Sequence, residues 1–554
     1  MLDNKIVLSD TEIRDQNATP FVVAALQQLN TTGGTLCFTP GTYHFYKDGA
    51  YNAFYAVCNN AAGEKAIVFP LLNAAHLTVD GGGAVLVFHD IVMPFAVDGC
   101  RDVTLKNMTL DRAEPPYARM RVRDVSAKGF GLEIDRTESP FFLEDGILHF
   151  LREYGVRSGR ERKYALHATK RIRERYLFTG DCTDSTENLP VAYMWGDAEE
   201  RDWGIYLTYR EGLGASPCLY EEGEELFVLL DGNRDVDSFF LQDSEQVRIE
   251  NITVRHGLGM GIIGQLCRDV TVKGFSTDAT GHENGVTICT DAMHFVNCDG
   301  RLEISECDIS HTGDDGLNVH GVYTHLQDLT DSGMEVALMH QEQHGFCPYR
   351  AGDLLSLIDR KTLSRVAEFR VTDAQVNGKD KSRIAVGGEF LSGLDGLAAL
   401  DEVLVENPLR MPDLHLHHNH FHHYPNLRIS GGGAMLVEHN LLECSKSAMV
   451  ISDLWDYWYE SGRVRDLVIR NNRMVGCNRL GAYPAFLQIG VSGFDDATAP
   501  KIHNRIEISG NLFADIGQYV LTAGGVADLT VRDNRYDDST DARMRIDGKE
   551  EAAR

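Results

Sequence analysis

The chain has 554 residues, 43% of them apolar or aromatic, which is enough to build a large hydrophobic core. Its 53 basic and 82 acidic residues give a net charge of −29, which repels phosphate backbones and anionic membranes and argues against nucleic acid as a partner. No run of eighteen apolar residues occurs, and the twelve cysteines include no CxxC pair. We therefore expect no membrane insertion, no disulfide framework and no structural zinc site.

The N-terminus shows no export signal, because residues 1–15 lack the apolar core of a signal peptide. We expect a cytoplasmic protein if the chain is complete, and a secreted or periplasmic one if a leader has been removed. The oligomeric state stays open, and a homo-oligomer is compatible with the sequence.

A helix is predicted near the start of the chain. Thr19 and Pro20 open the apolar stretch FVVAALQQLN, and Pro is favoured at the first position of a helix. Such a helix would cover the open end of a repeat structure, which repeat proteins need. Residues 33–43 then read as strand, turn and strand, and we assign residues 1–115 to this cap and the first repeats.

Short strand-like segments recur along the chain, and most of them end near an asparagine, as in VTLKNMTL, VRIENITV and IEISGNLF. Gly274 and Cys307 take the place of the asparagine in two repeats. Neighbouring positions such as 419 and 440 lie 21 residues apart, which is shorter than a propeller blade of roughly 40–50 residues. Asn and Gly tolerate the positive φ of a tight turn, and stacked asparagines can hydrogen-bond along the repeat axis. The asparagines are Asn107, Asn251, Asn419, Asn440, Asn472, Asn511 and Asn534.

These repeats predict an all-β fold, a right-handed parallel β-helix with two inserted small β-rich domains. The inserts are expected at residues 116–228 and, as a barrel-like domain, at residues 322–405, where the repeat is missing. Residues 229–321 would form the coils that carry the chemistry, residues 406–540 the C-terminal coils, and residues 541–554 a tail.

Three carboxylates stand out because their spacing follows the repeat. Asp291 and Asp315 are 24 residues apart, about one coil, so they should stack on neighbouring strands about 4.8 Å apart, with Asp314 beside them. Gly313 and Gly316 should let the backbone bend and turn Asp314 and Asp315 to the surface.

Strand parity places further polar groups on the same face. With Leu317 and Val319 toward the core, Asn318 and His320 face outward, and the same reasoning turns His294 outward in the coil below. Crowded carboxylates suit glycoside hydrolysis, which needs one acid and one carboxylate to activate water. A calcium site or a surface acidic turn is the alternative that the residues alone leave open.

Three later segments hold further candidates. Arg428 should lie on the coil above Asp315, where it binds a sugar hydroxyl or pairs with a surface carboxylate. The aromatic-rich segment with Trp455, Trp458 and Glu460 suits stacking against sugar rings, or packing of an insert against the coils. The histidine-rich run 415–423 gives no clean tetrahedral set, so we expect no metal there.

The segments around these residues resemble glycoside hydrolase family 110, the α-1,3-galactosidases. The matching motifs are GMGIIGQ from Gly259, TDAMHF from Thr290, GDDGLNVHG from Gly313, and WYESG and VRDLVIRNN between Trp458 and Asn472. The matches span most of residues 20–535.

The resemblance implies an inverting exo-hydrolase that releases terminal α-1,3-linked galactose, as in blood-group B or linear Galα1-3Gal structures. It implies Asp314 as the acid, Asp291 and Asp315 as the pair that holds and deprotonates water, and no metal or cofactor. The expected partner is an oligosaccharide or glycoconjugate. A polygalacturonase-like hydrolase would need clustered Arg and Lys at the site, and a non-catalytic glycan-binding β-helix would not need three stacked aspartates.

Overall fold

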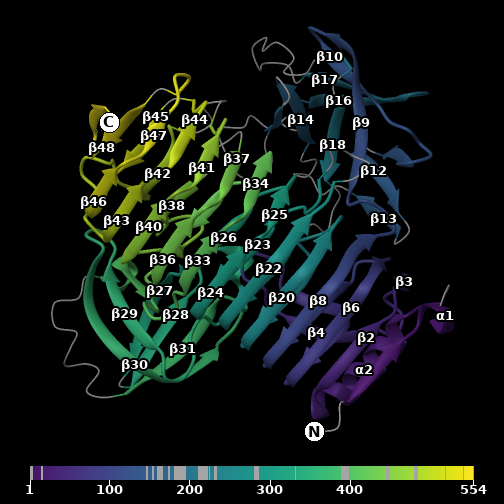
Figure 1. Ribbon diagram of the computed structural model, residues 1–554, viewed down its shortest axis with the longest axis horizontal. Coiled ribbons are helices and arrows are strands. Elements are labelled where there is room, and N and C mark those ends of the chain that lie inside the picture. Colours follow the sequence, from purple (N-terminus) through teal and green to yellow (C-terminus); the bar gives the residue numbers. More distant parts are fainter. Residues whose placement is uncertain are drawn as a thin grey trace.

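The computed structural model describes residues 4–552 apart from the short gaps that follow. The gaps are 14–15, 145–146, 153–154, 159–165, 173–174, 180–194, 210–221, 224, 230–233, 280–285, 331, 388–398, 424, 445–448, 479–483, 518 and 541. Helix α1 (Asp10–Ile13) is short, and α2 (Thr19–Thr32) is the longest helix of the described part. Almost all other regular structure is β-strand, as Figure 1 shows.

Two long sheets wind around one core, and within them nearly all strand pairs are parallel. The predicted parallel β-helix is therefore confirmed. The first sheet contains β1 (Lys5–Leu8), β2 (Gly34–Phe38), β3 (Thr42–Phe45), β6 (Ala75–Phe88), β8 (Arg101–Arg112), β20 (Glu245–Val254), β22 (Arg268–Thr277), β24 (Asp299–Ser305), β25 (Asp308–Ser310), β33 (Asp413–His417), β34 (His420–His423), β36 (Ala434–Glu438), β37 (Leu441–Cys444), β40 (Asp466–Arg470), β41 (Arg473–Val475), β43 (His503–Ser509), β44 (Leu512–Ala514), β46 (Val526–Arg532) and β47 (Arg535–Tyr536).

The second sheet lines the other side of the coils and carries the candidate site. Its strands are β4 (Tyr51–Tyr55), β5 (Gly63–Leu72), β7 (Met93–Asp98), β19 (Phe239–Gln242), β21 (Ile262–Gln265), β23 (Met293–Val296), β26 (Leu317–Val322), β35 (Leu427–Ile429), β38 (Met449–Asp453), β39 (Glu460–Ser461), β42 (Ala485–Val491), β45 (Tyr519–Ala523), β48 (Arg543–Ile546) and β49 (Lys549–Ala552).

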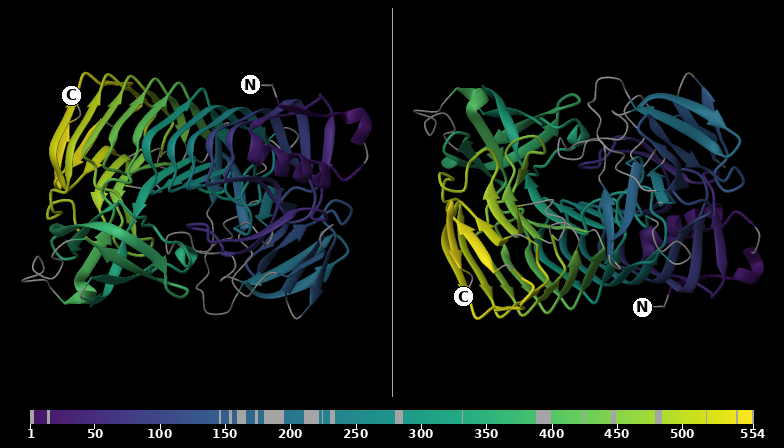
Figure 2. Two further views of the ribbon diagram at one scale, coloured as in Figure 1. Left: turned by 90° about the horizontal axis from the view of Figure 1, so that it is seen from below. Right: turned by 90° about the horizontal axis from the view of Figure 1, so that it is seen from above.

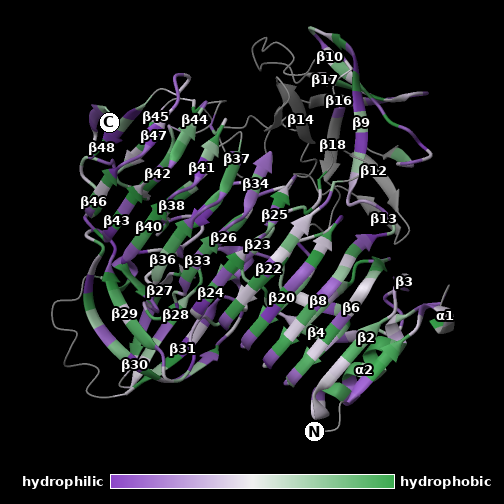
Figure 3. Ribbon diagram, in the orientation of Figure 1, coloured by the Kyte–Doolittle hydropathy of each residue, from purple (hydrophilic) through white to green (hydrophobic). Residues whose placement is uncertain are grey.

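Alternation of apolar and polar residues builds the core between the sheets. In β20 the side chains of Val247, Ile249, Ile252 and Val254 are buried, whereas the residues between them reach the surface. Figure 3 shows the same alternation along the strands of both halves. At the N-terminal end α2 turns Val22 toward this core, with Pro20 in its first turn, so the predicted cap is present.

The two halves of the helix use different devices to stack their coils. In the N-terminal half Phe69, Phe95 and Phe239 form a stack, with ring centroids 4.2 and 4.8 Å apart. In the C-terminal half five asparagines, the first four of them buried, form a ladder in which the Nδ2 of each of these four donates to the Oδ1 of the next at 3.0 Å. They are Asn419, Asn440, Asn472, Asn511 and Asn534.

The ladder asparagines differ from the expectation in one respect. Asn107, Asn251 and Gly274 do adopt positive φ, but in the ladder the preceding residue does so instead, as at His418 and Asp533. The ladder asparagine is thereby free to turn its amide along the axis. The ladder stops at the backbone N–H of Cys307, which donates to Oδ1 of Asn419 at 2.9 Å because a cysteine offers no amide to continue it.

Two inserted units project from the same side of the coils, and the chain ends lie at opposite ends of the stack (Figure 2). The unit nearer the C-terminal coils is a closed antiparallel barrel with a core of its own around Leu355 and Val405. It is formed by β27 (Thr324–Thr330), β28 (Gly333–Ala337), β29 (Leu354–Asp359), β30 (Ser364–Val376), β31 (Lys381–Val386) and β32 (Val403–Glu406). Two 3-10 turns, η1 (Gln341–Gln343) and η3 (Leu400–Glu402), lie between its strands.

The other inserted unit is an antiparallel sheet accompanied by a three-stranded sheet. The larger sheet contains β9 (Tyr117–Ser126), β10 (Gly129–Glu133), β14 (Leu166–Ile172), β15 (Arg175–Thr179), β16 (Trp195–Arg201), β17 (Gly204–Tyr209) and β18 (Glu225–Leu229). The smaller contains β11 (Phe141–Glu144), β12 (Ile147–Arg152) and β13 (Gly155–Ser158).

The last residues of the chain continue the second sheet. Strand β48 pairs in parallel with β45, and β49 folds back onto it, so most of the segment 541–554 forms a hairpin rather than the expected tail. None of the helices in the described residues is both long and apolar enough to span a membrane.

Candidate active site

A recess with about 420 Å³ of free space opens over strands β23, β26 and β35. Eight of the ten residues singled out from the sequence line it, and Asn59, Arg234 and Met260 join them. The eight are Asp291, His294, Asp314, Asp315, Asn318, Arg428, Trp458 and Glu460.

Strand register explains how the aspartates meet. His294 on β23 lies opposite Asn318 on β26, so the same register places Asp291 opposite Asp315 just before each strand begins. The backbone N–H of Ala292 donates to the carbonyl of Asp315 at 2.8 Å, which fixes the two coils at this point. One carboxylate oxygen from each of Asp291, Asp314 and Asp315 lies within 4.8 Å of the other two.

The three aspartates differ in exposure, which corrects part of the sequence-based picture. Asp291 and Asp315 are 4% and 3% exposed, and only Asp314 reaches the surface, with 44% of its side chain exposed. Gly313 and Gly316 do not turn the pair outward through positive φ; they leave room for close packing. A Cβ at Gly313 would lie 2.1 Å from the carbonyl of Cys289, and one at Gly316 would lie 2.7 Å from Pro425.

Burial changes the acidity of the two inner carboxyls. Desolvation raises the pKa of Asp291 well above its ordinary range, and the charge of Asp314 adds to the effect. Desolvation also raises the pKa of Asp315, although the Arg428 guanidinium opposes it. The inner pair therefore favours a proton at pH values at which an exposed aspartate would be ionised, and the Arg428 guanidinium beside Asp315 directs that proton to Asp291.

Arg428 lies beside Asp315 at the floor of the recess. Its Nε is 3.0 Å from Oδ2 of Asp315, so the pairing expected with a surface carboxylate is made with a buried one. Among the described residues no group donates to the buried Oδ1 of Asp315. A buried acceptor of this kind offers a position for a water or a sugar hydroxyl.

A chain of hydrogen bonds leads from Asp291 away from the recess. Nδ1 of His320 is 2.6 Å from the carbonyl of Gly321, so it carries a proton. Burial lowers the pKa of His294 and of His320 to about 4, so both rings are neutral at neutral pH. Nε2 of His320 then accepts from Nε2 of His294 at 2.7 Å.

That tautomer leaves only one role for the remaining ring nitrogen. Nδ1 of His294 is an acceptor, and it lies 2.7 Å from Oδ2 of Asp291. A hydrogen bond there requires the proton to come from Asp291. The histidine chain thus favours the protonated form of Asp291, in agreement with the effect of burial.

Glu460 closes the recess above His320. Its Oε1 accepts from the Asn59 amide at 3.0 Å and lies 3.4 Å from Nε2 of His320. Burial opposes ionisation of Glu460, but the pKa of Glu460 still lies below its ordinary value, and the Arg428 guanidinium and the hydrogen bond from Asn59 are among the groups that lower it. This covering explains why Asn318 and His320 are 5% and 1% exposed although they point away from the core. His320 therefore lies behind the wall of the recess rather than in it.

The residues that sequence reasoning missed come from irregular segments. Arg234 lies 3.9 Å from Oδ2 of Asp314, donates to the carbonyl of Asn59 at 2.7 Å, and has its guanidinium 5.9 Å from the Trp458 ring centroid. Asn59 sits in a loop with φ of 60°. The polar composition of both segments was the only available signal, because neither carries the repeat.

Trp455, expected to stack on a sugar or to pack an insert against the coils, does not line the recess. Its indole N–H donates to the carbonyl of Ser492 at 2.5 Å, and its ring packs against the cluster that holds Tyr323 and Ile358. The alternative, packing of the insert against the coils, describes this residue. Trp458 in the same loop does face the recess.

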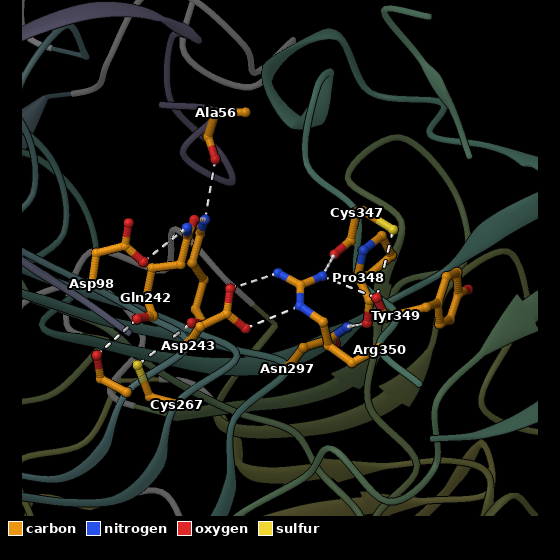
Figure 4. A network of polar contacts seen from close by, with 12 residues as sticks. Ala56, Asp98, Gln242, Asp243, Cys267, Asn297, Cys347, Pro348, Tyr349 and Arg350 are labelled. Atoms are coloured by element: carbon orange, nitrogen blue, oxygen red, sulfur yellow. Dashed lines mark hydrogen bonds and ion pairs between the residues drawn. The ribbon is translucent and has the colours of Figure 1, made fainter. Parts of the chain in front are cut away.

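A polar network near the recess, shown in Figure 4, links the barrel unit and the Asn59 loop to the coils. Arg350 of the barrel unit binds both oxygens of Asp243 at 3.0 and 2.7 Å, and it also donates to the carbonyls of Cys347 and Tyr349. Gln265 joins this region to the Asn59 loop by donating to the carbonyl of Ala56 at 3.1 Å. The loops around the recess are therefore fixed by charged and amide contacts.

The aspartate cluster could in principle hold a cation, as the alternative interpretation of the sequence stated. Two guanidinium groups already lie beside it, Arg428 on Asp315 and Arg234 near Asp314. These charges compensate the carboxylates and compete with a divalent cation, so the arrangement suits proton chemistry better.

The chain is similar to several proteins named α-1,3-galactosidase along almost its whole length. An α-1,3-galactosidase B of Bacteroides thetaiotaomicron is 26% identical over 530 residues, covering 94% of this chain and 83% of the relative. α-1,3-Galactosidases A of Shewanella woodyi and Bacteroides fragilis are 28% and 26% identical, each over 94% of this chain and 83% and 84% of their own length. No protein-family model matches the chain. These relatives confirm the resemblance to the α-1,3-galactosidases that the motifs predicted.

Solved structures were also compared with the chain. The A-module of a mannuronan C-5 epimerase from Azotobacter vinelandii is 10% identical, with a TM-score of 0.38 over 96% of this chain and 95% of its own. A family 28 exopolygalacturonase of Yersinia enterocolitica is 12% identical, with a TM-score of 0.32 over 99% of this chain and 79% of its own.

Proposed function

We propose that this relative of the α-1,3-galactosidases is itself an exo-acting glycoside hydrolase that removes terminal α-1,3-linked galactose with inversion. The observation that carries the proposal is the cluster of three carboxylates within 4.8 Å, two buried and one exposed, at the floor of a walled recess. Its near-full-length similarity to proteins of that name supports the choice of galactose.

The proposed acid is Asp314, because it is the one carboxyl of the three that a departing sugar can reach from solvent. Its proton passes to the glycosidic oxygen as the bond to the anomeric carbon breaks. Arg234 beside it would then stabilise the carboxylate that forms.

The proposed water site lies between Asp291 and Asp315. Oδ1 of Asp315 accepts the proton of the attacking water, and Arg428 holds that carboxylate in place through Oδ2. His294 accepts from Asp291 and keeps this carboxyl oriented. The water adds to the anomeric carbon from the face opposite the leaving oxygen, so the first product is β-galactose.

Inversion is proposed from the family resemblance, not from spacing. The two carboxyls of an inverting pair usually lie about 6.5–9.5 Å apart, and the aspartates here are closer. The exo mode is proposed from the same resemblance, and Trp458, Glu460 and Asn59, which line the recess, are the residues that would close it around a terminal sugar.

The decisive experiment offers the protein paired branched fucosylated B-type and linear Galα1-3Gal oligosaccharides and follows the released anomer by NMR. Release of β-galactose first is expected from at least one of them. Release of α-galactose first would contradict inversion, and no release from either would contradict the galactosidase proposal.

A second experiment separates catalysis from mere binding. Asp314→Asn should reduce turnover by about 10²–10⁴-fold while substrate binding, measured by calorimetry, stays close to that of the unchanged protein. The exposed Asp528→Asn serves as the control and should keep full activity. Unchanged turnover in Asp314→Asn would favour a non-catalytic glycan-binding protein.

A polygalacturonase-like activity is the second candidate, because two arginines, Arg234 and Arg428, line the recess and could hold a uronate carboxylate. Both are already engaged with acidic groups of the chain, which favours a neutral sugar. Release of galacturonate from polygalacturonate, with no release from the galactosides, would support this candidate instead.

A further inference from the structure

A second cluster of histidines and carboxylates lies on the outer face of the first sheet, away from the recess. Asp308 on β25 lies opposite His420 on β34, and His422 on β34 lies opposite Glu443 on β37. Phe421 and Ile309 between them are fully buried, so the alternation of the strands turns the polar four outward.

The donor atoms of three of these residues converge. Nε2 of His422 lies 2.8 Å from Oδ1 of Asp308, and Nδ1 of His420 lies 3.5 Å from Oδ2 of the same carboxylate. All three donor atoms lie within 4.8 Å of one another. The side chains are 55%, 31% and 21% exposed for Asp308, His420 and His422, so an ion in solution can reach them.

The surrounding groups prepare the imidazoles as ligands. Glu443 lies 2.9 Å from Nε2 of His420, so it can accept the proton there when Nδ1, which faces Asp308, binds an ion. Nδ1 of His422 lies 2.7 Å from Nδ1 of His423, which can accept a proton from it, so Nε2 of His422, which faces Asp308, can give its lone pair to an ion. A carboxylate behind a ligating histidine is the usual support of a protein metal site.

We propose that Asp308, His420 and His422 form a binding site for a divalent transition metal, zinc by the preferences of these ligands, with Glu443 as its supporting carboxylate. Two imidazoles and one carboxylate leave a fourth position open for water, as in other three-ligand zinc sites. The sequence alone did not indicate this site, because Asp308 lies more than one hundred residues before the histidine-rich run.

The position of the site suggests what the metal does. Asp308 and His422 are 114 residues apart in sequence because the barrel unit is inserted between their coils. A metal there would tie the coil that continues into Asp314 and Asp315 to the coil that continues into Arg428. The metal would close a long loop of the chain. A link of this kind lowers the conformational entropy of the unfolded chain more than one that closes a short loop, so it would stabilise the folded protein.

The test uses the untagged full-length protein, freed of metal by a chelator and titrated with zinc chloride by calorimetry. We expect about one zinc ion per chain and a higher Tm with zinc than without. His422→Ala should abolish this binding, and Glu443→Ala should weaken it by about 10–100-fold. Asp308→Asn removes a ligand at an exposed position and serves if His422→Ala does not fold.

The matched control is His417→Ala, which alters a histidine on the neighbouring strand β33 that also faces a carboxylate, Glu303. This variant should bind zinc like the unchanged protein. The proposal is overturned if the unchanged protein binds no zinc, or if His422→Ala and Asp308→Asn both bind it normally. It is also overturned if Asp315→Asn abolishes the binding, since the ion would then sit in the recess.

Discussion

Asp308 and Asp315 belong to one coil, seven residues apart, and face opposite sides of it. Asp315 is 3% exposed, and desolvation raises its pKa even though a guanidinium lies beside it. Partial burial also opposes ionisation of Asp308, but hydrogen bonds from His420 and His422 outweigh it and lower its pKa. The contrast shows that the environment sets the chemistry of a carboxyl: one aspartate is prepared to exchange protons and the other to stay charged.

The largest difference between the two faces should appear in activity. Asp315→Asn removes the proposed proton acceptor, and we expect kcat/KM on a galactosyl oligosaccharide to fall by about 10²–10⁴-fold. Asp528→Asn, at an exposed position far along the chain, is the control. Activity within a few fold of the unchanged protein would show that Asp315 does not take the proton.

Removal of the Arg428 guanidinium beside Asp315 should affect both activity and stability. Arg428→Gln leaves the buried Asp315 without its ion pair, so we expect the free energy of unfolding to fall. The loss should be only about 2 kcal/mol, because Asp315 can take up a proton and so avoid being a buried unpaired charge. The loss of orientation should also lower kcat by about 10²-fold. Arg505→Gln, which breaks an exposed pair with Asp466, should change the free energy of unfolding far less in chemical denaturation. If the two variants lost the same free energy of unfolding, the buried ion pair of Asp315 would be no more important to stability than an exposed one.

The proton on Asp291 should be visible in the pH dependence of stability. A carboxyl whose folded pKa is raised contributes stability below its unfolded pKa of about 4, and this contribution is lost as the pH rises through the folded pKa. The amide introduced by Asp291→Asn would not ionise and could still donate to His294. We therefore expect the free energy of unfolding of this variant, relative to that of the unchanged protein, to rise by about 1 kcal/mol from pH 5 to pH 8 when it is measured by thermal unfolding. A difference that stays constant with pH would show that Asp291 is not protonated in the folded protein.

The smallest effect is expected at Asp308. Its side chain is half-exposed, and exposed ion pairs contribute less than about 1 kcal/mol, so Asp308→Ala should hardly change the unfolding of the metal-free protein. A large loss of stability in metal-free Asp308→Ala would mean that the outer face of the first sheet needs this carboxylate to stay folded.

The repeats allowed the fold and part of the site to be predicted. A ladder asparagine such as Asn472 has the same neighbours in each coil, so its spacing carries the architecture in the sequence itself. Asp291 and Asp315 were brought together by the same spacing. Their stacking follows from register, which a regular solenoid determines almost completely.

The rest of the site depends on segments that have no period. Arg234 and Asn59 lie in loops whose conformation is set by contacts with distant parts of the chain, as in the hydrogen bond from Arg234 to Asn59. The burial of His320 was missed for a similar reason, because parity describes one strand and not the segment that covers it. For Trp455 and Trp458 both alternatives stayed open, since an aromatic loop gives no sign of which ring packs inward.

The hydrogen bond between Asn59 and Glu460 joins residues that are 401 positions apart. A ribosome must therefore make more than four-fifths of the chain before both sides of the recess exist, whatever the order in which the coils wind. A fragment that ends before Glu460 could contain all three aspartates and still have an open, unwalled floor. Such a fragment would test whether the carboxylates act on their own, and we expect it to be inactive.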